Sequence, residues 1–128
     1  MKRVLITTVP FARTNRLPIE LLDAAGIEYV INPLDKKLTA EELESMINEF
    51  DAVIAGTEYI TESVLDNAPR LKIISRVGVG LDGVDLNAAR VRDIVVTYTP
   101  DAPAPAVAEL TIGNIISLLR GTHLSNLM

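Results

Sequence analysis

Residues 71–86 read Leu-Lys-Ile-Ile-Ser-Arg-Val-Gly-Val-Gly-Leu-Asp-Gly-Val-Asp-Leu. The first part of this stretch, residues 71–75, predicts a buried strand, because β-branched isoleucines stand at its centre. Glycines follow at positions 78, 80 and 83, and Asp85 can then cap a helix. Glycine lets backbone N–H groups approach a ligand closely, and a helix start carries partial positive charge. The stretch therefore predicts a site for an anion.

The spacing Gly78-x-Gly80-x-x-Gly83 also matches the dinucleotide fingerprint GxGxxG. Asp101 follows about 20 residues later, where an acid that binds a ribose hydroxyl would stand. The fingerprint normally follows the first strand of its domain, whereas about three strand–helix units precede it here. The residues alone therefore leave open a site for a nucleotide or another anion, and a glycine turn without a ligand.

Length and composition narrow the class of protein. The chain has 128 residues, enough for one domain with a real core and too few for two. Apolar residues make up 48% of it, so a folded domain is expected. The net charge of −5 argues against nucleic acid as a partner, because there is no basic stripe to neutralise phosphates. The absence of cysteine excludes disulfides, thiolate metal sites and a cysteine nucleophile.

The N-terminus enters a short apolar run directly, without the longer apolar stretch and the cleavage site of a signal peptide. No apolar run reaches the length of a membrane span. These observations predict a soluble, cytoplasmic protein with no membrane partner.

Strand-like and helix-like segments alternate along the chain. Thr39 and Glu42 have the spacing of a capping box, Thr61 can cap another helix, and Gly26 can stop the first one. The expected strands are 4–8, 28–31, 51–55, 71–75 and 94–97. The expected helices are 18–25, the segment that Thr39 opens, 61–67, 86–92 and 106–120. This alternation predicts an α/β fold with a parallel sheet and helices on both faces.

Ligands of such a sheet bind beyond the carboxyl ends of its strands. The loops at these ends are 8–10, 56–58 and 76–80, which we expect to converge on one site. Arg76 is a candidate partner for an anionic substrate, and Thr57 could donate a hydroxyl group into the same cleft. The alternatives, which the residues do not separate, are a surface arginine and a helix-entry turn residue.

Other chemistries lack the residues that they need. A receiver domain requires acids at the ends of its first and third strands, where this chain has Thr7-Thr8 and Gly56-Thr57, with Glu58 out of place. A flavodoxin would need aromatic residues around its flavin, and the chain has three tyrosines, two phenylalanines and no tryptophan. His123 is the only histidine and lies in the tail, and no metal-ligand spacing occurs. We therefore assign no catalytic, cofactor-binding or metal-binding residue.

Several ordered blocks carry a resemblance to a known family. They are 56–62 (Gly-Thr-Glu-Tyr-Ile-Thr-Glu), 74–89 (Ile-Ser-Arg-Val-Gly-Val-Gly-Leu-Asp-Gly-Val-Asp-Leu-Asn-Ala-Ala), 94–100 (Ile-Val-Val-Thr-Tyr-Thr-Pro), 106–113 (Ala-Val-Ala-Glu-Leu-Thr-Ile-Gly) and 118–120 (Leu-Leu-Arg). Over about residues 50–121 the chain resembles the D-isomer-specific 2-hydroxyacid dehydrogenases, most closely the phosphoglycerate dehydrogenase branch. Before residue 50 the likeness is one of strand–helix pattern.

The resemblance implies a fold and a role. The fold is a flavodoxin-like three-layer sandwich with a five-stranded parallel sheet in the order 2-1-3-4-5. Residues 1–104 would form the substrate-binding (catalytic) domain. Residues 105–128 would be a long helix and tail that lead to an NAD-binding Rossmann domain, which these residues do not include. NAD is the cofactor of the full-length family, and none is expected to bind to this chain.

The resemblance also implies how a small 2-hydroxy or 2-keto acid is held. The backbone N–H groups of Val79 and Gly80 would bind its carboxylate. The expected substrate site consists of Thr57, Arg76, Gly78, Val79 and Gly80. Gly83 stands where the family has asparagine, so the third glycine of the fingerprint is taken as accidental. Thr57 stands where phosphoglycerate-specific members place an arginine, which argues against phosphoglycerate as the substrate.

We therefore expect an isolated, truncated or excised substrate-binding domain of an NAD-dependent D-2-hydroxyacid dehydrogenase, inactive alone. The alternatives are a stand-alone anion- or nucleotide-binding module that uses the turn Gly78–Gly83, and a structural or dimerising fragment. Apolar residues of the helix 106–120 would face the absent domain and, left bare, would favour a homodimer. These residues are Val107, Leu110, Ile115, Leu118 and Leu119.

Overall fold

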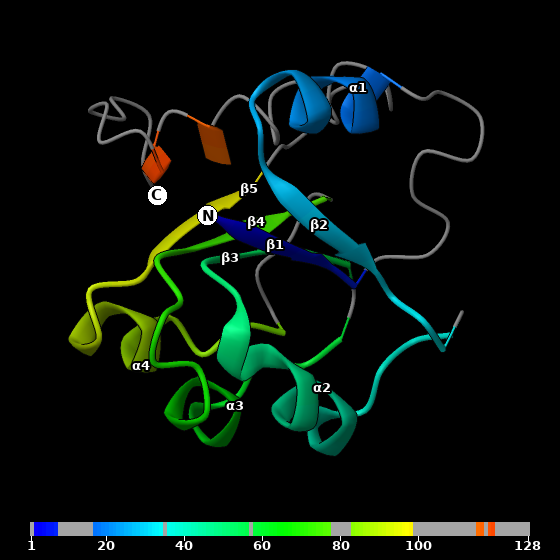
Figure 1. The fold of residues 1–128 in the computed structure, drawn as a ribbon. Helices are drawn as coiled ribbons and strands as arrows, with labels where there is room; N and C mark the ends of the chain where they lie inside the picture. The colour runs from blue at the N-terminus through cyan, green and yellow to red at the C-terminus, as the bar shows by residue number, and fades with distance from the viewer. Residues whose placement is uncertain are drawn as a thin grey trace.

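In the computed structural model, helices flank a five-stranded parallel sheet (Figure 1). The structure describes residues 2–7, 17–34, 36–56, 58–77, 83–98, 115–116 and 118–119. The strands are β1 (Arg3–Ile6), β2 (Glu28–Ile31), β3 (Ala52–Ala55), β4 (Ile73–Arg76) and β5 (Val95–Tyr98). Their order in the sheet is β2-β1-β3-β4-β5, and all neighbours are parallel. The predicted fold class and strand order are confirmed.

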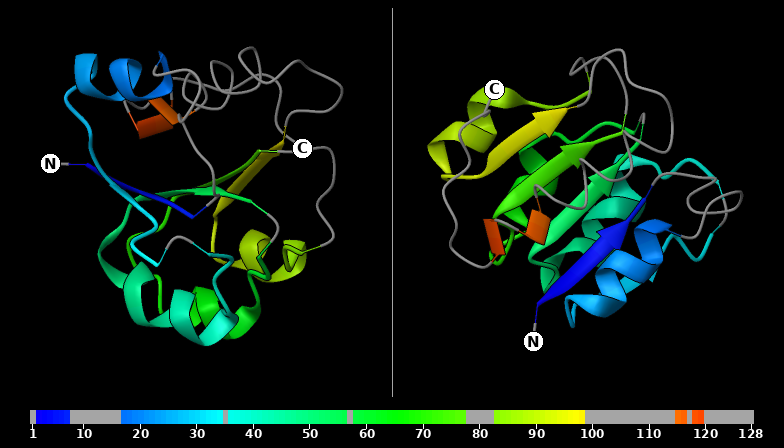
Figure 2. Two further views of the ribbon diagram at one scale, coloured as in Figure 1. Left: turned by 90° about the vertical axis from the view of Figure 1, so that its right-hand side faces the viewer. Right: turned by 90° about the horizontal axis from the view of Figure 1, so that it is seen from above.

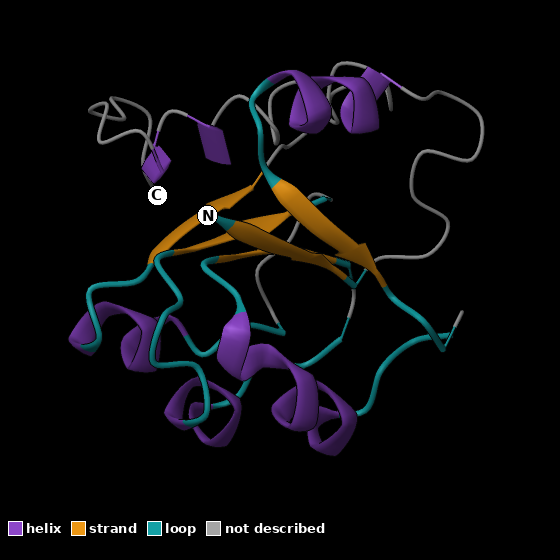
Figure 3. Ribbon diagram, viewed as in Figure 1, coloured by secondary structure: helices purple, strands orange, loops and turns teal. Residues whose placement is uncertain are grey.

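The helices cover both faces of the sheet, as the alternation in the sequence predicts. On one face lie α1 (Leu17–Ala24) and the helical residues 115–116 and 118–119 (Figure 1). On the other face lie α2 (Ala40–Met46), its 3₁₀ continuation η1 (Ile47–Glu49), α3 (Glu62–Asp66) and α4 (Leu86–Val91) (Figure 3). Figure 2 shows the same division from two further directions. Of the helices described, none has the length and apolar character needed to cross a membrane.

Side-chain caps begin three helices at the residues that the sequence predicts. The hydroxyl of Thr39 accepts a hydrogen bond from the N–H of Glu42 (3.2 Å), and the Glu42 carboxylate accepts one from the N–H of Thr39 (3.0 Å). Lys36 donates to the same carboxylate over 2.7 Å, and chiefly for this reason the pKa of Glu42 is lowered. Thr61 and Asp85 cap α3 and α4 with their side-chain oxygens.

β4 begins later than predicted and includes Arg76. The N–H of Leu71 donates to the carbonyl of Ala68 over 3.2 Å, so this residue still belongs to the turn that follows α3. Arg76 pairs with Ala55 of β3 in the parallel ladder. It is therefore part of the sheet, whereas the sequence placed it in the loop after the strand.

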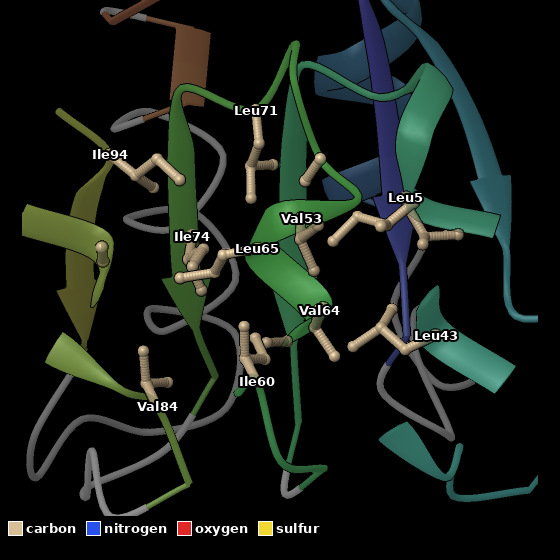
Figure 4. Packing of buried hydrophobic residues seen from close by; sticks show 14 of the residues in the cluster. Leu5, Leu43, Val53, Ile60, Val64, Leu65, Leu71, Ile74, Val84 and Ile94 are labelled. Carbon is tan, nitrogen blue, oxygen red and sulfur yellow. The ribbon is translucent and has the colours of Figure 1, made fainter. Parts of the chain in front are cut away.

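The larger hydrophobic cluster lies between the sheet and the helices α2, α3 and α4 (Figure 4). Leu5, Val53 and Ile74 contribute to it from three neighbouring strands, and Leu43 and Leu65 meet them from α2 and α3. All five side chains are buried. Because alternate residues of a strand point to opposite faces, the remaining apolar residues of these strands form a second cluster under α1.

Ile115 is fully buried in this second cluster, among strand residues such as Ile6 and Ile73. Leu118 and Leu119 are partly buried against the same cluster. The expectation that these side chains would be left bare is wrong for Ile115 and only partly right for the two leucines, because the sheet of the chain itself offers them an apolar surface. Val107 and Leu110 lie outside the described residues.

Leu43 provides a test of the larger cluster. Replacing this fully buried side chain in Leu43→Ala removes apolar contacts and leaves a cavity, so we expect the free energy of unfolding to fall by about 2–5 kcal/mol. Leu86→Ala is the matched control, because Leu86 also lies in a helix and is 45% exposed. Urea titrations followed by circular dichroism measure both. Equal losses in the two variants would contradict this account of the core.

Candidate functional site

Buried polar side chains gather at the carboxyl ends of the strands. Among the described residues, every buried polar or charged one except Asp51 lies at this edge of the sheet. They are Thr7, Asn32, Glu58, Ser75, Arg76 and Thr97. Burial of polar groups is unfavourable unless they find partners, so such a concentration is typical of a functional edge rather than of a packing core.

Two of these side chains project from strand ends that flank the same strand, β3. Arg76 pairs with Ala55 in the ladder between β4 and β3. The N–H of Thr7 donates to the carbonyl of Ile54 over 2.9 Å, which continues the ladder between β1 and β3 and places Thr7 beside Ala55. Neighbouring strands are about 4.8 Å apart. Thr7 and Arg76 therefore lie about two strand spacings apart, one on each side of β3.

Glu58 is 2% exposed and folds back over the strand ends. Its Oε1 accepts a hydrogen bond from the backbone N–H of Gly56 (2.7 Å) and another from the hydroxyl of Thr7. The carboxylate thus ties the carboxyl end of β3 to that of β1, across 51 residues of sequence. Among the described lysines and arginines, none lies within 4 Å of it.

Arg76 is 7% exposed, and its Nε has no hydrogen-bond partner in the part of the chain that the structure describes. A buried guanidinium group that leaves a donor unpaired is costly. An anionic ligand oxygen would satisfy this donor, since guanidinium groups bind carboxylates and phosphates with charge-assisted hydrogen bonds. Arg76 is therefore the described residue best suited to hold an anion.

Asn32 fixes the loop that follows β2. Its side-chain amide donates to the carbonyls of Thr7 (3.2 Å) and Lys36 (2.7 Å), and its Oδ1 accepts a hydrogen bond from the N–H of Leu34 (2.9 Å). This buried side chain anchors the loop to the end of β1. The edge of the sheet is thereby held together from β2 to β3 by side-chain hydrogen bonds.

The two loops that carry the predicted site are joined at their flanks. The N–H of Ile60 donates to the carbonyl of Gly83 (2.8 Å), and the N–H of Asp85 donates to the carbonyl of Ile60 (3.0 Å). The N–H of Val77 donates to the carbonyl of Ala55 (2.9 Å). The described residues that flank the two loops therefore lie beside each other.

Of the predicted substrate site, the structure describes Arg76 alone. Thr57, Gly78, Val79 and Gly80 lie outside the described residues, as do residues 8–10 and Asp101. Sequence reasoning considered Glu58 only as a receiver-domain acid and missed its role at the edge of the sheet. The available signal was an acid shortly after the wholly apolar strand β3. No group of three or more metal-ligating side chains occurs within the described ranges.

A sequence profile of the D-isomer specific 2-hydroxyacid dehydrogenase catalytic domain matches residues 4–124. The chain belongs to this family. It is 41% identical to D-3-phosphoglycerate dehydrogenase of Methanocaldococcus jannaschii over 85 residues. These residues make up 65% of this chain and 16% of that protein. It is 34% identical to hydroxypyruvate reductase of Thermotoga maritima over 105 residues. These residues make up 77% of this chain and 34% of that protein.

Solved structures agree with this membership. NAD⁺-bound 3-phosphoglycerate dehydrogenase of Entamoeba histolytica has a TM-score of 0.71 and 33% identity, with 98% of this chain and 41% of that one covered. Apo D-lactate dehydrogenase of Escherichia coli has a TM-score of 0.63 and 25% identity, with 94% and 38% covered. This chain thus spans between 16% and 41% of the length of these four proteins.

The bond between Thr7 and Glu58 can be tested by a double-mutant cycle. Thr7→Val removes a donor from a buried carboxylate, so we expect the free energy of unfolding to fall by about 1–3 kcal/mol. In a Glu58→Leu background the same change should cost much less, because no buried carboxylate remains to lose its donor. Ser63→Ala, which removes an exposed hydroxyl group, is the control. Equal costs in the two backgrounds, measured by urea titration, would show that the bond contributes nothing.

Proposed function

We propose that this chain is the substrate-binding part of an NAD-dependent D-2-hydroxyacid dehydrogenase, with residues 1–104 as the substrate domain and 105–128 as the connection to a cofactor domain. The observation that carries the proposal is the buried Arg76, whose Nε has no partner among the described residues, at the carboxyl edge of a sheet whose family acts on 2-hydroxy acids. The complete enzyme would exchange a hydride between C2 of the acid and the nicotinamide. The chain alone would bind the acid without turning it over.

The roles in this proposal follow from the sequence and from its resemblance to the family. Arg76 would attract the carboxylate of the acid, and the backbone N–H groups of Val79 and Gly80 would bind it. Gly78 would allow the backbone to approach the ligand closely, and the hydroxyl of Thr57 would donate to an oxygen of the substrate. This division assigns anion binding to the loop after β4 and a neutral donor to the loop after β3.

The described residues do not suit NAD itself. A dinucleotide places its pyrophosphate on a free helix N-terminus that follows a glycine turn. Here the N-terminus of α4 is occupied by Asp85, whose carboxylate accepts the N–H of Ala88 over 3.0 Å. A second anion at this helix start would meet the Asp85 charge. The nicotinamide cofactor is therefore proposed to bind outside this domain.

Titration of the ¹⁵N-labelled chain with pyruvate and, separately, with NADH tests the proposal. We expect pyruvate to shift the amide resonances of Val79 and Gly80, and NADH to shift none of them. Arg76→Gln should weaken pyruvate binding roughly tenfold or more, because a charge-assisted hydrogen bond is lost. Arg70→Gln is the matched control, since Arg70 lies in the turn before the opposite end of β4 and its side chain is 52% exposed. Circular dichroism checks that both variants fold.

Two results would contradict the proposal. Shifts of Gly78–Gly83 and Asp101 with NADH would favour a stand-alone nucleotide-binding module. No shift with any 2-keto acid would favour a structural fragment.

We also propose that the chain forms a homodimer through residues 106–120, as Leu118 and Leu119 stay partly exposed after packing on the sheet. Multi-angle light scattering should give about twice the monomer mass of 13.9 kDa. Leu118→Glu should shift the chain towards monomer, because it places a charge in the apolar contact, whereas Leu34→Glu, at a side chain that is 43% exposed elsewhere, should not. A monomer at high protein concentration would refute the dimer.

A further inference from the structure

Glu58 occupies a special place in the topology of the sheet. In the order β2-β1-β3-β4-β5, the connection from β1 to β2 runs towards one edge strand of the sheet, whereas the connections from β3 to β4 and on to β5 run towards the other. The switch point therefore lies between β1 and β3, where open parallel sheets usually leave a crevice for a ligand. Glu58 bridges this point, since its Oε1 is hydrogen-bonded to both Thr7 and Gly56. The switch point is thus occupied by a buried carboxylate of the chain itself.

The carboxylate of Glu58 is held on one side of the carboxyl edge of the sheet. Glu58 is 2% exposed, and no described lysine or arginine lies within 4 Å of its carboxylate to neutralise it. Arg76 lies on the other side of β3, beyond Ala55. Counting the described residues alone, the edge has a positive end at β4 and a negative end at β1 and β3. Charges in a partly buried site interact several times more strongly than they do in water.

We propose that Glu58 is a specificity-determining residue that excludes substrates with a second anionic group. This inference rests on the proposed function and deepens it, since it names the substrate class: small 2-hydroxy or 2-keto acids whose only charge is the carboxylate. The carboxylate of such an acid lies towards Arg76, and its uncharged end can extend over β3. A phosphorylated acid would have to place a dianion near Glu58 or leave the carboxylate away from Arg76.

The relatives of this chain are named for both phosphorylated and unphosphorylated acids. One relative is named for a phosphorylated acid, D-3-phosphoglycerate, and another for an unphosphorylated one, hydroxypyruvate. Identities of 41% and 34% do not separate the two substrate classes. The position of Glu58 favours the unphosphorylated class.

D-Glycerate and 3-phospho-D-glycerate form a matched pair of probes, because they differ only in the phosphoryl group. We expect the unaltered chain to bind D-glycerate at least about tenfold more tightly than 3-phospho-D-glycerate, as measured by isothermal titration calorimetry or amide shifts. Glu58→Gln removes the charge and keeps an oxygen that can accept from Gly56 and Thr7. It should reduce the ratio of the two dissociation constants by about tenfold. Glu58→Ala, which removes the charge without adding a donor, should act in the same direction.

Glu62→Gln is the matched control, because it removes an equal charge from an exposed position at the start of α3. It should leave the ratio unchanged. Circular dichroism establishes which variants fold, and either Glu58 variant is sufficient; if neither folds, the ratio in the unaltered chain decides.

Each outcome separates this inference from the proposed function. Binding of D-glycerate with an unchanged ratio in the Glu58 variants, or tighter binding of the phosphorylated acid by the unaltered chain, would overturn the role of Glu58 and leave the proposed function standing. Failure of both probes to bind would overturn both.

Discussion

β3 is the strand on which the rest of the structure depends. Its four residues are buried on both faces, and it pairs with β1 on one side and β4 on the other. The whole sheet is held in register through this strand, since β2 and β5 attach only to its neighbours. A strand that is covered on both faces needs small or apolar side chains throughout, which is why Ala52–Ala55 contains nothing else.

The segment that follows β3 carries Glu58, which has a structural and a chemical consequence. Glu58 returns to the strand ends and bridges the switch point between β1 and β3, which leaves a buried carboxylate at the carboxyl edge of the sheet. Arg76 places a buried positive charge one strand away on the other side. Because opposite charges are held apart by β3 rather than paired with each other, the edge is polarised. A polarised edge can orient an anionic ligand as well as attract it.

This arrangement supports the proposed role of the chain as a substrate-binding domain within the 2-hydroxyacid dehydrogenase family. The described residues carry groups that suit the binding of one small anion, and the helix start that a dinucleotide would need is occupied by Asp85. Family members are expected to share the sheet. In the proposal above, the charged residues at its carboxyl edge would select among acids, because charges in a partly buried site interact more strongly than they do in water.

The sequence by itself determined the local elements and their order. Thr39, Thr61 and Asp85 cap their helices as predicted, because a cap depends only on residues within one turn of each other. Resemblance to the family supplied the strand order, which the structure confirms. These features rest on short-range chemistry or on a pattern that relatives share.

Tertiary structure alone decided the surroundings of the site. Glu58 meets Thr7 only because β1 and β3 become neighbours, and Arg76 is buried because the ladder extends to it. Ile115 packs on the sheet of its own chain, where the sequence suggested a bare face. In each case the partner is far away in the chain, so no local pattern could specify it. Burial and pairing of charged groups are properties of the assembled edge, and they follow from the packing of strands that the sequence separates.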